Sequence, residues 1–139
     1  MYRRSYRDIE NKDGSDEMKL IINEIPPSNN KFMGNGSVKK QAHVYQDIKK
    51  QWAILIRLAV GRKPKTPIEK AIVTITYYFP NRIRRDPDNY SGKFINDGLV
   101  KAGVLKDDSF NNIHLVLKGD YDKDNPRTEI LIEEVRDGN

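Results

Sequence analysis

Two aspartates separated by a proline are the first candidate metal ligands, in the segment Asp86-Pro87-Asp88-Asn89. In an extended chain, residues two apart project to the same side, and Pro87 favours extended geometry at Asp86. Two carboxylates that point the same way would offer the hard oxygen ligands that Mg²⁺ prefers. The alternative is a turn followed by a helix cap, because Asp and Asn are favoured there. For these four residues alone, the turn is the better interpretation.

A second acidic pair, Asp107-Asp108, changes that balance. The pair could itself be a turn between a helix and a strand. However, a helix predicted from about residue 89 to 102 is about 20 Å long, and five extended residues from Val104 to Asp108 return roughly 16 Å. We therefore expect Asp108 to lie close to the first acidic pair. Such a three-carboxylate cluster repels itself without a cation and suits metal-assisted hydrolysis of a phosphodiester.

Basic residues surround these acids. Arginines just before the first acidic pair are expected to hold a phosphate backbone. Lys93, about one turn into the predicted helix, could stabilise charge that develops on a scissile phosphate. Asp97 lies four residues further on the same face, where an ion pair with Lys93 is the preferred interpretation. The residues expected to contact DNA are Arg82, Arg84, Arg85, Lys39 and Lys40.

Composition sets the limits on fold and class. The 139 residues fit one domain, and 37% hydrophobic with 32% charged residues indicates a globular protein. A net charge of +5 favours a polyanionic partner. The chain has no cysteine, which excludes disulfides, thiolate zinc sites and a cysteine nucleophile. No apolar run approaches the roughly 20 residues that span a bilayer, and no secretory segment is recognised, so a cytoplasmic protein without membrane contact is expected.

The pattern along the chain predicts a single α+β domain. Residues 1–16 are polar and aperiodic and are expected to form a flexible N-terminal arm, while residues 17–139 form the domain. Hydrophobic periodicity predicts strands at 19–25, 68–79, 112–118 and 128–135, and helices at 38–58 and 89–102. This order, β-α-β-α-β-β, indicates one mixed β-sheet with the helices packed against a face.

Several spaced motifs, taken together, resemble the signature of the RusA family of Holliday junction resolvases. They are Asp86-Pro87-Asp88-Asn89, Lys93, Asp97-Gly98-Leu99, Ala102-Gly103-Val104 and Asp107-Asp108-Ser109. The motif covers about residues 85–109, and a weaker similarity extends to residues 25–30 and to the helix with Tyr45. One departure is that three residues separate Asn89 from Lys93, one more than the family spacing.

This resemblance implies a homodimeric endonuclease that uses Mg²⁺, or Mn²⁺ as a substitute. The family makes paired, symmetric nicks in four-way DNA junctions during recombination and repair, and it is common in phages and prophages. By the resemblance, Asp86, Asp88 and Asp108 would be catalytic and would hold the metal, and Lys93 matches the family's lysine. The metal would activate a water molecule. Hydrolysis of the phosphodiester by this water would leave 5′-phosphate and 3′-hydroxyl ends.

Two other functions fit the same residues. A non-catalytic module that binds branched DNA would have the same basic surface, with the acids serving as turns and caps. The same fold and metal site could instead act on flaps, replication forks or RNA-containing junctions. A protein-binding role is a third possibility, and it predicts no salt-sensitive affinity for DNA.

Overall fold

The computed structural model describes residues 17–29 and 38–136, so the arm predicted at residues 1–16 lies outside the described residues. The described part contains four strands, two α-helices and a short 3₁₀ helix. They are β1 (Glu17–Ile22), α1 (Val38–Val60), β2 (Ala71–Phe79), η3 (Pro87–Asn89), α2 (Lys93–Lys101), β3 (Ile113–Tyr121) and β4 (Arg127–Glu134). The predicted α+β class and the order β-α-β-α-β-β are confirmed.

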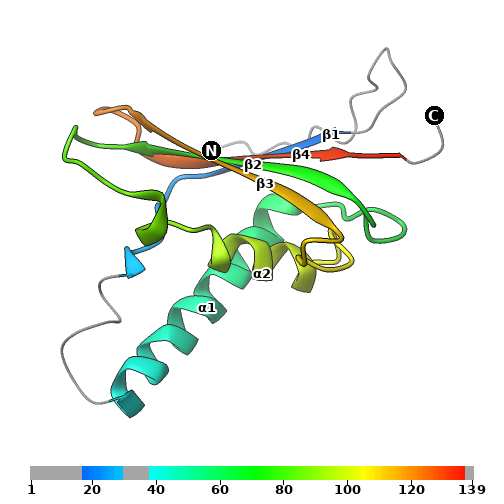
Figure 1. The fold of residues 1–139 in the computed structure, drawn as a ribbon, viewed down its shortest axis with the longest axis horizontal. Helices are drawn as coiled ribbons and strands as arrows, with labels where there is room; N and C mark the ends of the chain where they lie inside the picture. The colour runs from blue at the N-terminus through cyan, green and yellow to red at the C-terminus, as the bar shows by residue number, and fades with distance from the viewer. Residues whose placement is uncertain (1–16, 30–37, 137–139) are drawn as a thin grey trace.

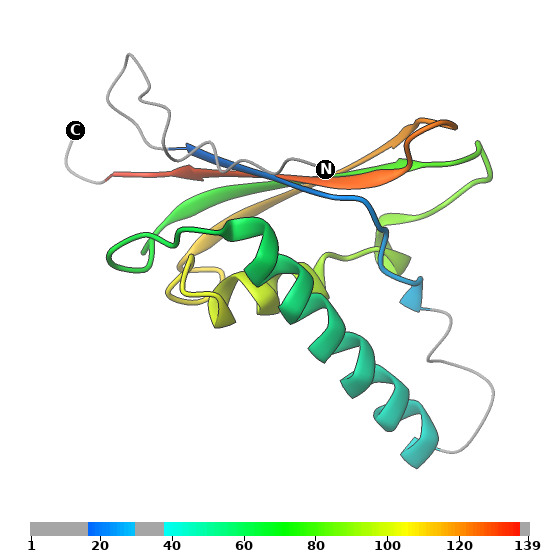
Figure 2. The ribbon, with the colours of Figure 1, turned by 180° about the vertical axis from the view of Figure 1, so that it is seen from behind.

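The strands form one mixed sheet in the order β1-β4-β2-β3. β4 pairs antiparallel with both β1 and β2, whereas β2 and β3 are parallel. Parallel neighbours need a crossover connection, and α2 lies within that connection. Figures 1 and 2 show both helices on the same face of the sheet, with α1 running obliquely and its first turns extending beyond the sheet. Neither described helix is long and apolar enough to cross a membrane.

The core lies between the sheet and the helices. Alternate residues of β1, β2 and β4 are buried, as expected for strands with one covered face. Their side chains pack with Trp52 and Ile56 of α1 and Leu99 of α2, each at most 2% exposed. At Gly98 the helices are so close that an added Cβ would lie 2.8 Å from Ile56 Cγ1. This contact fixes α2, and the residues around it, against α1.

The structure corrects several predicted boundaries, among them the end of β3, which lies at Tyr121 rather than at 118. β1 runs from Glu17 to Ile22 rather than from 19 to 25, because Pro26 and the residues before it leave the sheet. Residues 68–70 precede β2, and Ile68 instead forms an isolated bridge with Leu105. The second helix begins at Lys93 rather than near 89. A 3₁₀ turn and a left-handed glycine occupy residues 87–92, and both interrupt α-helical geometry.

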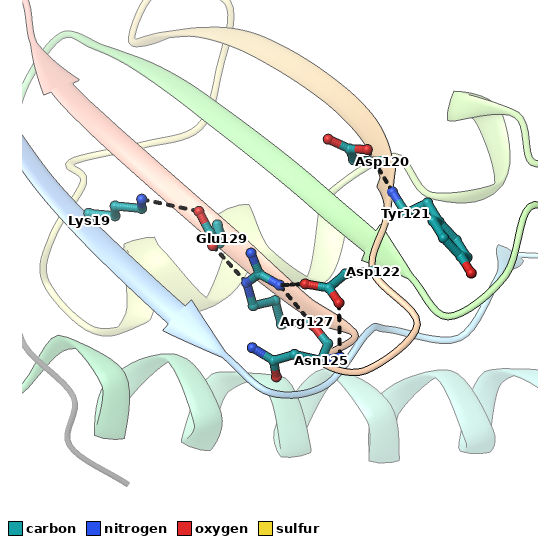
Figure 3. Close-up of polar contacts among 7 residues, drawn as sticks. All are labelled: Lys19, Asp120, Tyr121, Asp122, Asn125, Arg127 and Glu129. Atoms are coloured by element: carbon teal, nitrogen blue, oxygen red, sulfur yellow. Dashed lines mark hydrogen bonds and ion pairs between the residues drawn. The ribbon is translucent and has the colours of Figure 1, made fainter.

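The face of the sheet opposite the helices carries an ion-pair network around Arg127 (Figure 3). The Arg127 guanidinium donates to Glu129 Oε2 at 2.7 Å and to Asp122 Oδ2 at 2.8 Å, and it lies 3.9 Å from the centre of the Tyr78 ring. Lys19 of β1 joins Glu129 at 3.1 Å. The network therefore ties the β3–β4 turn to β4 and β4 to β1.

These contacts predict acid sensitivity. The Arg127 hydrogen bond lowers the pKa of Asp122. Burial alone would raise the pKa of Glu129, but hydrogen bonds from Arg127 and Lys19 outweigh it and lower that pKa. Groups with a lowered pKa stabilise the fold above their unfolded pKa and lose that effect as the pH falls. We expect the free energy of unfolding, measured by urea titration, to drop below about pH 4.

Replacing Glu129 tests this assignment. Glu129→Gln should lower the free energy of unfolding at pH 7 by about 1–3 kcal/mol, because Arg127 loses a charged partner. The further loss of stability on going to acid pH should be smaller in this variant than in the wild type. Glu133→Gln is the matched control, since Glu133 lies on the same strand but has no part in the network. Equal losses from both variants would contradict the role of Glu129.

Candidate functional site

The first acidic pair lies in the connection between β2 and α2. Asp86 has extended geometry (φ −108°, ψ 144°) and occupies the N-cap position of η3, but its carboxylate caps no backbone group. Its Oδ1 lies 3.4 Å from Arg84 Nε, and both side chains are more than half exposed. Asp88 lies inside η3, so the extended geometry predicted for both acids is found only at Asp86. The cap interpretation therefore fails for the Asp86 carboxylate.

Arg85 anchors this connection from within. Its guanidinium donates to the carbonyls of Asn81 and Ile83 at 3.1 and 2.9 Å and to Asn81 Oδ1 at 2.8 Å. It also lies 4.3 Å from the centre of the Phe79 ring. Most of its donors are thus used inside the loop, which makes Arg85 a weaker candidate for phosphate contact than the exposed Arg84.

Contacts with neighbouring segments hold the acidic connection in place. Asn29 Nδ2 donates to the carbonyl oxygen of Asp88 at 2.7 Å, which joins the segment after β1 to the acidic connection. The Tyr90 ring packs 5.0 Å from Phe79 and 5.8 Å from Tyr77, centre to centre. Burial raises the pKa of Tyr77, and Tyr90 adds to the rise. The segment that carries the exposed aspartates is therefore packed against buried aromatic side chains.

Gly92 sets the start of α2. Its φ is +83°, a conformation that side chains with a Cβ rarely adopt. An added Cβ would lie 2.8 Å from Ile75 Cδ1, so both backbone and space require glycine. Because α2 begins directly afterwards, Lys93 is its first residue and not one turn inside it, as the sequence had suggested.

A second group of charges gathers beside α2. Lys93 Nζ lies 5.6 Å from the centre of the Tyr45 ring. The adjacent Tyr45 side chain raises the pKa of Lys93, and the carboxylates of Asp97 and Asp108 add to the rise. Asp97 Oδ2 lies 3.7 Å from Lys49 Nζ, so its ion pair is with Lys49 and not, as the sequence had suggested, with Lys93. Lys49, on the same face of α1 as Tyr45, was not predicted as part of the site.

Asp108 belongs to this second group. Burial raises the pKa of its carboxyl, and the nearby charge of Asp97 raises it further. The neighbouring Asp107 has a different role: its Oδ1 accepts a hydrogen bond from the Asp108 backbone N–H at 2.8 Å. Asp107 therefore contacts the backbone of its neighbour, but the turn predicted at residues 106–109 is not formed at Asp107 and Asp108.

The two acidic groups do not merge. Among residues 17–29 and 38–136, no three His, Cys, Asp or Glu side chains are placed so that they could hold a metal ion. The expected cluster of Asp86, Asp88 and Asp108 is therefore not assembled. The return segment is held by Ile68, which exchanges hydrogen bonds with the carbonyl of Val104 and the N–H of Lys106 at 2.8 and 2.9 Å. Asp108 consequently comes back beside Asp97.

The remaining basic candidates are at the surface. Arg82 is exposed, with its guanidinium 4.2 Å from the centre of the Tyr121 ring. Lys39 and Lys40 are exposed in the first turn of α1. Figures 1 and 2 both show the start of α1 and the connection between β2 and α2 toward the same end of the molecule.

Comparison with known proteins adds no relative. No protein-family model matches the chain, and no curated protein matches it significantly. The resemblance to the RusA signature therefore depends on the motif residues themselves.

Proposed function

We propose that the protein is a Mg²⁺-dependent endonuclease that resolves four-way DNA junctions in the cytoplasm by paired, symmetric nicks. One observation carries the proposal: Lys93, Asp97 and Asp108 gather beside α2, immediately after an exposed acidic segment flanked by arginines. Acids that lie together among bases are typical of sites for phosphate chemistry.

Each residue has a defined task in this proposal. Arg82 and Arg84 hold backbone phosphates of the bound strands. Lys93, at the start of α2, stabilises the charge that develops on the scissile phosphate. Lys39 and Lys40 contact a neighbouring arm of the junction. Asp86, Asp88 and Asp108 are the candidate catalytic carboxylates, as the resemblance implies.

The donor chemistry suits Mg²⁺ or Mn²⁺, since all the candidate ligands are carboxylate oxygens. The arrangement of these carboxylates does not suit a metal ion, because the described residues hold no group of three such ligands. The ion enters the proposal through the resemblance, and when bound it would supply a Lewis acid for phosphodiester hydrolysis.

Two symmetric cuts need two equivalent sites, and we include a homodimer in the proposal. α1 offers apolar surface for a second copy. Leu58 is 68% exposed, Ile54 is 50% exposed and Val44 is 38% exposed. A monomeric mass for the active protein in solution would remove the paired-nick part of the proposal.

Cleavage of a synthetic four-way junction tests the function. With Mg²⁺ the wild type should give paired nicks that ligase can seal, and EDTA should stop the reaction. Asp88→Asn should cut at least about a hundredfold more slowly yet bind the junction with unchanged affinity. Glu133→Gln, near the end of β4 on the sheet face opposite the helices, is the control and should cut normally. Normal cleavage by the Asp88→Asn protein would refute the site.

A non-catalytic module that binds branched DNA is the second candidate. The separation of Asp86 and Asp88 from Asp108 favours it, because separate acids can serve as turns and ion-pair partners. Tight, salt-sensitive junction binding without nicking of junctions, flaps, forks or RNA-containing junctions would select this module.

A further inference from the structure

The turn that follows Asp108 carries a phenylalanine with no cover from the described residues. Phe110 is 105% exposed, the largest value among the exposed hydrophobic side chains of the described residues. Burial of a phenylalanine side chain stabilises a fold, and this domain forgoes that stabilisation at Phe110. The side chain therefore has no structural role in the described domain.

Hydrogen bonds fix the backbone of the turn that carries this ring. Ser109 Oγ donates to Asn112 Oδ1 at 2.7 Å, and Asn112 Nδ2 donates to the carbonyl of Glu69 at 2.8 Å. The backbone N–H groups of Asn112 and Ile113 both donate to the Ser109 carbonyl at 3.0 Å. Asn112 also accepts a hydrogen bond from Ala71 at 2.9 Å, which attaches the turn to the first residue of β2.

A shallow hollow lies against the ring. Its walls combine apolar and polar side chains, namely Asn96, Asp108, Ser109, Phe110, Ile113, His114 and Leu115. The lining therefore offers both apolar surface and hydrogen-bonding groups. A nucleobase combines the same two kinds of surface in its faces and its edge.

We propose that Phe110 is a stacking site for an unpaired or unstacked nucleobase at the branch point of the bound DNA. The inference rests on the proposed function, which supplies DNA as the substrate. The location follows from the exposed ring and from the hydrogen-bonded turn that carries it. Every base has a π-face, so an exposed aromatic ring binds bases with little sequence preference. Paired bases inside a duplex present no free face, whereas bases at a branch point do.

Stacking on Phe110 would set which phosphate reaches the candidate site. Two residues span at most about 7 Å of chain, and Phe110 is two residues beyond Asp108. Stacked nucleotides advance about 3.4 Å along a strand. A base on Phe110 would therefore place a phosphate within about two nucleotides of the branch point beside Asp108. Phe110 would select branched over linear DNA and would position the cut.

Junction binding in EDTA tests this site without cleavage. A four-way junction with 2-aminopurine at the branch point should change its fluorescence on binding the wild type. Phe110→Ala should abolish that change, weaken junction affinity about five- to a hundredfold, and leave duplex affinity unaltered. Phe110→Trp should restore both the signal and the affinity. Val135→Ala is the control and should leave the signal and the affinity unchanged, because Val135 is an exposed apolar residue just beyond β4 and outside the proposed DNA contacts.

The outcomes separate this inference from the nuclease proposal. If Phe110→Ala binds and cuts junctions as the wild type does, the stacking site is refuted while the nuclease stands. If stacking depends on Phe110 but no DNA is ever cut, the stacking site stands and the nuclease falls. If Phe110→Ala instead converts a dimer to a monomer, the ring contacts a second copy and the nucleobase site is refuted.

Discussion

Gly92→Ala should destabilise the protein by about 2–4 kcal/mol and lower its melting temperature by about 5–15 °C. Two costs combine. An alanine in the left-handed region costs about 1–2 kcal/mol, and the φ of Gly92 is +83°. The new Cβ would also lie 2.8 Å from Ile75 Cδ1, whose side chain is fully buried and cannot move freely. Overpacking of this kind costs about 1–3 kcal/mol. Thermal and urea denaturation would measure both quantities.

Gly61→Ala separates the two costs. Gly61 also has a positive φ, +65°, but an added Cβ there would meet no heavy atom within 4 Å. Its variant should lose only the conformational part, about 1–2 kcal/mol. Equal losses at both positions would show that Ile75 adapts without cost. The start of α2, and with it the position of Lys93, would then not depend on the contact beneath Gly92.

The class of fold was predictable because periodicity determines it. Alternation in β2 and β4 and the three- and four-residue spacing around Trp52 correspond to elements with one covered face, which two layers satisfy. The start of α2 was not predictable in this way. It depends on the space beneath Gly92, where Ile75 excludes a side chain, and on the left-handed backbone that glycine allows.

The site was predictable in its residue types but not in its geometry. Chain length alone allowed Asp108 to return to the first acidic pair. The return path instead depends on hydrogen bonds between Ile68 and the segment after α2, and Ile68 lies more than thirty residues earlier in the sequence. Lys49 was missed for the same reason: its partner Asp97 belongs to another helix. Contacts between distant segments leave no local pattern to read.

Asp108→Asn should separate activity from stability. Burial and the charge of Asp97 raise the pKa of Asp108, so the folded protein disfavours its ionised form. Such a carboxylate lowers stability as the pH rises from its unfolded pKa through its folded pKa. Asparagine keeps the size and removes the charge. The variant should therefore be about 0.5 kcal/mol more stable than the wild type at pH 7 in EDTA, while junction cleavage falls about a hundredfold or more.

Asp107→Asn is the matched control for this prediction. An asparagine there keeps the Oδ1 that accepts the hydrogen bond from the Asp108 N–H, so this backbone contact is preserved. Its cleavage rate should stay within a few-fold of the wild type. A stabilised Asp108→Asn protein that cannot cut indicates that the fold tolerates an unfavourable charge for the sake of the reaction, as active sites commonly do. An Asp108→Asn protein that is less stable, or that cuts as well as Asp107→Asn, would reduce Asp108 to a structural residue.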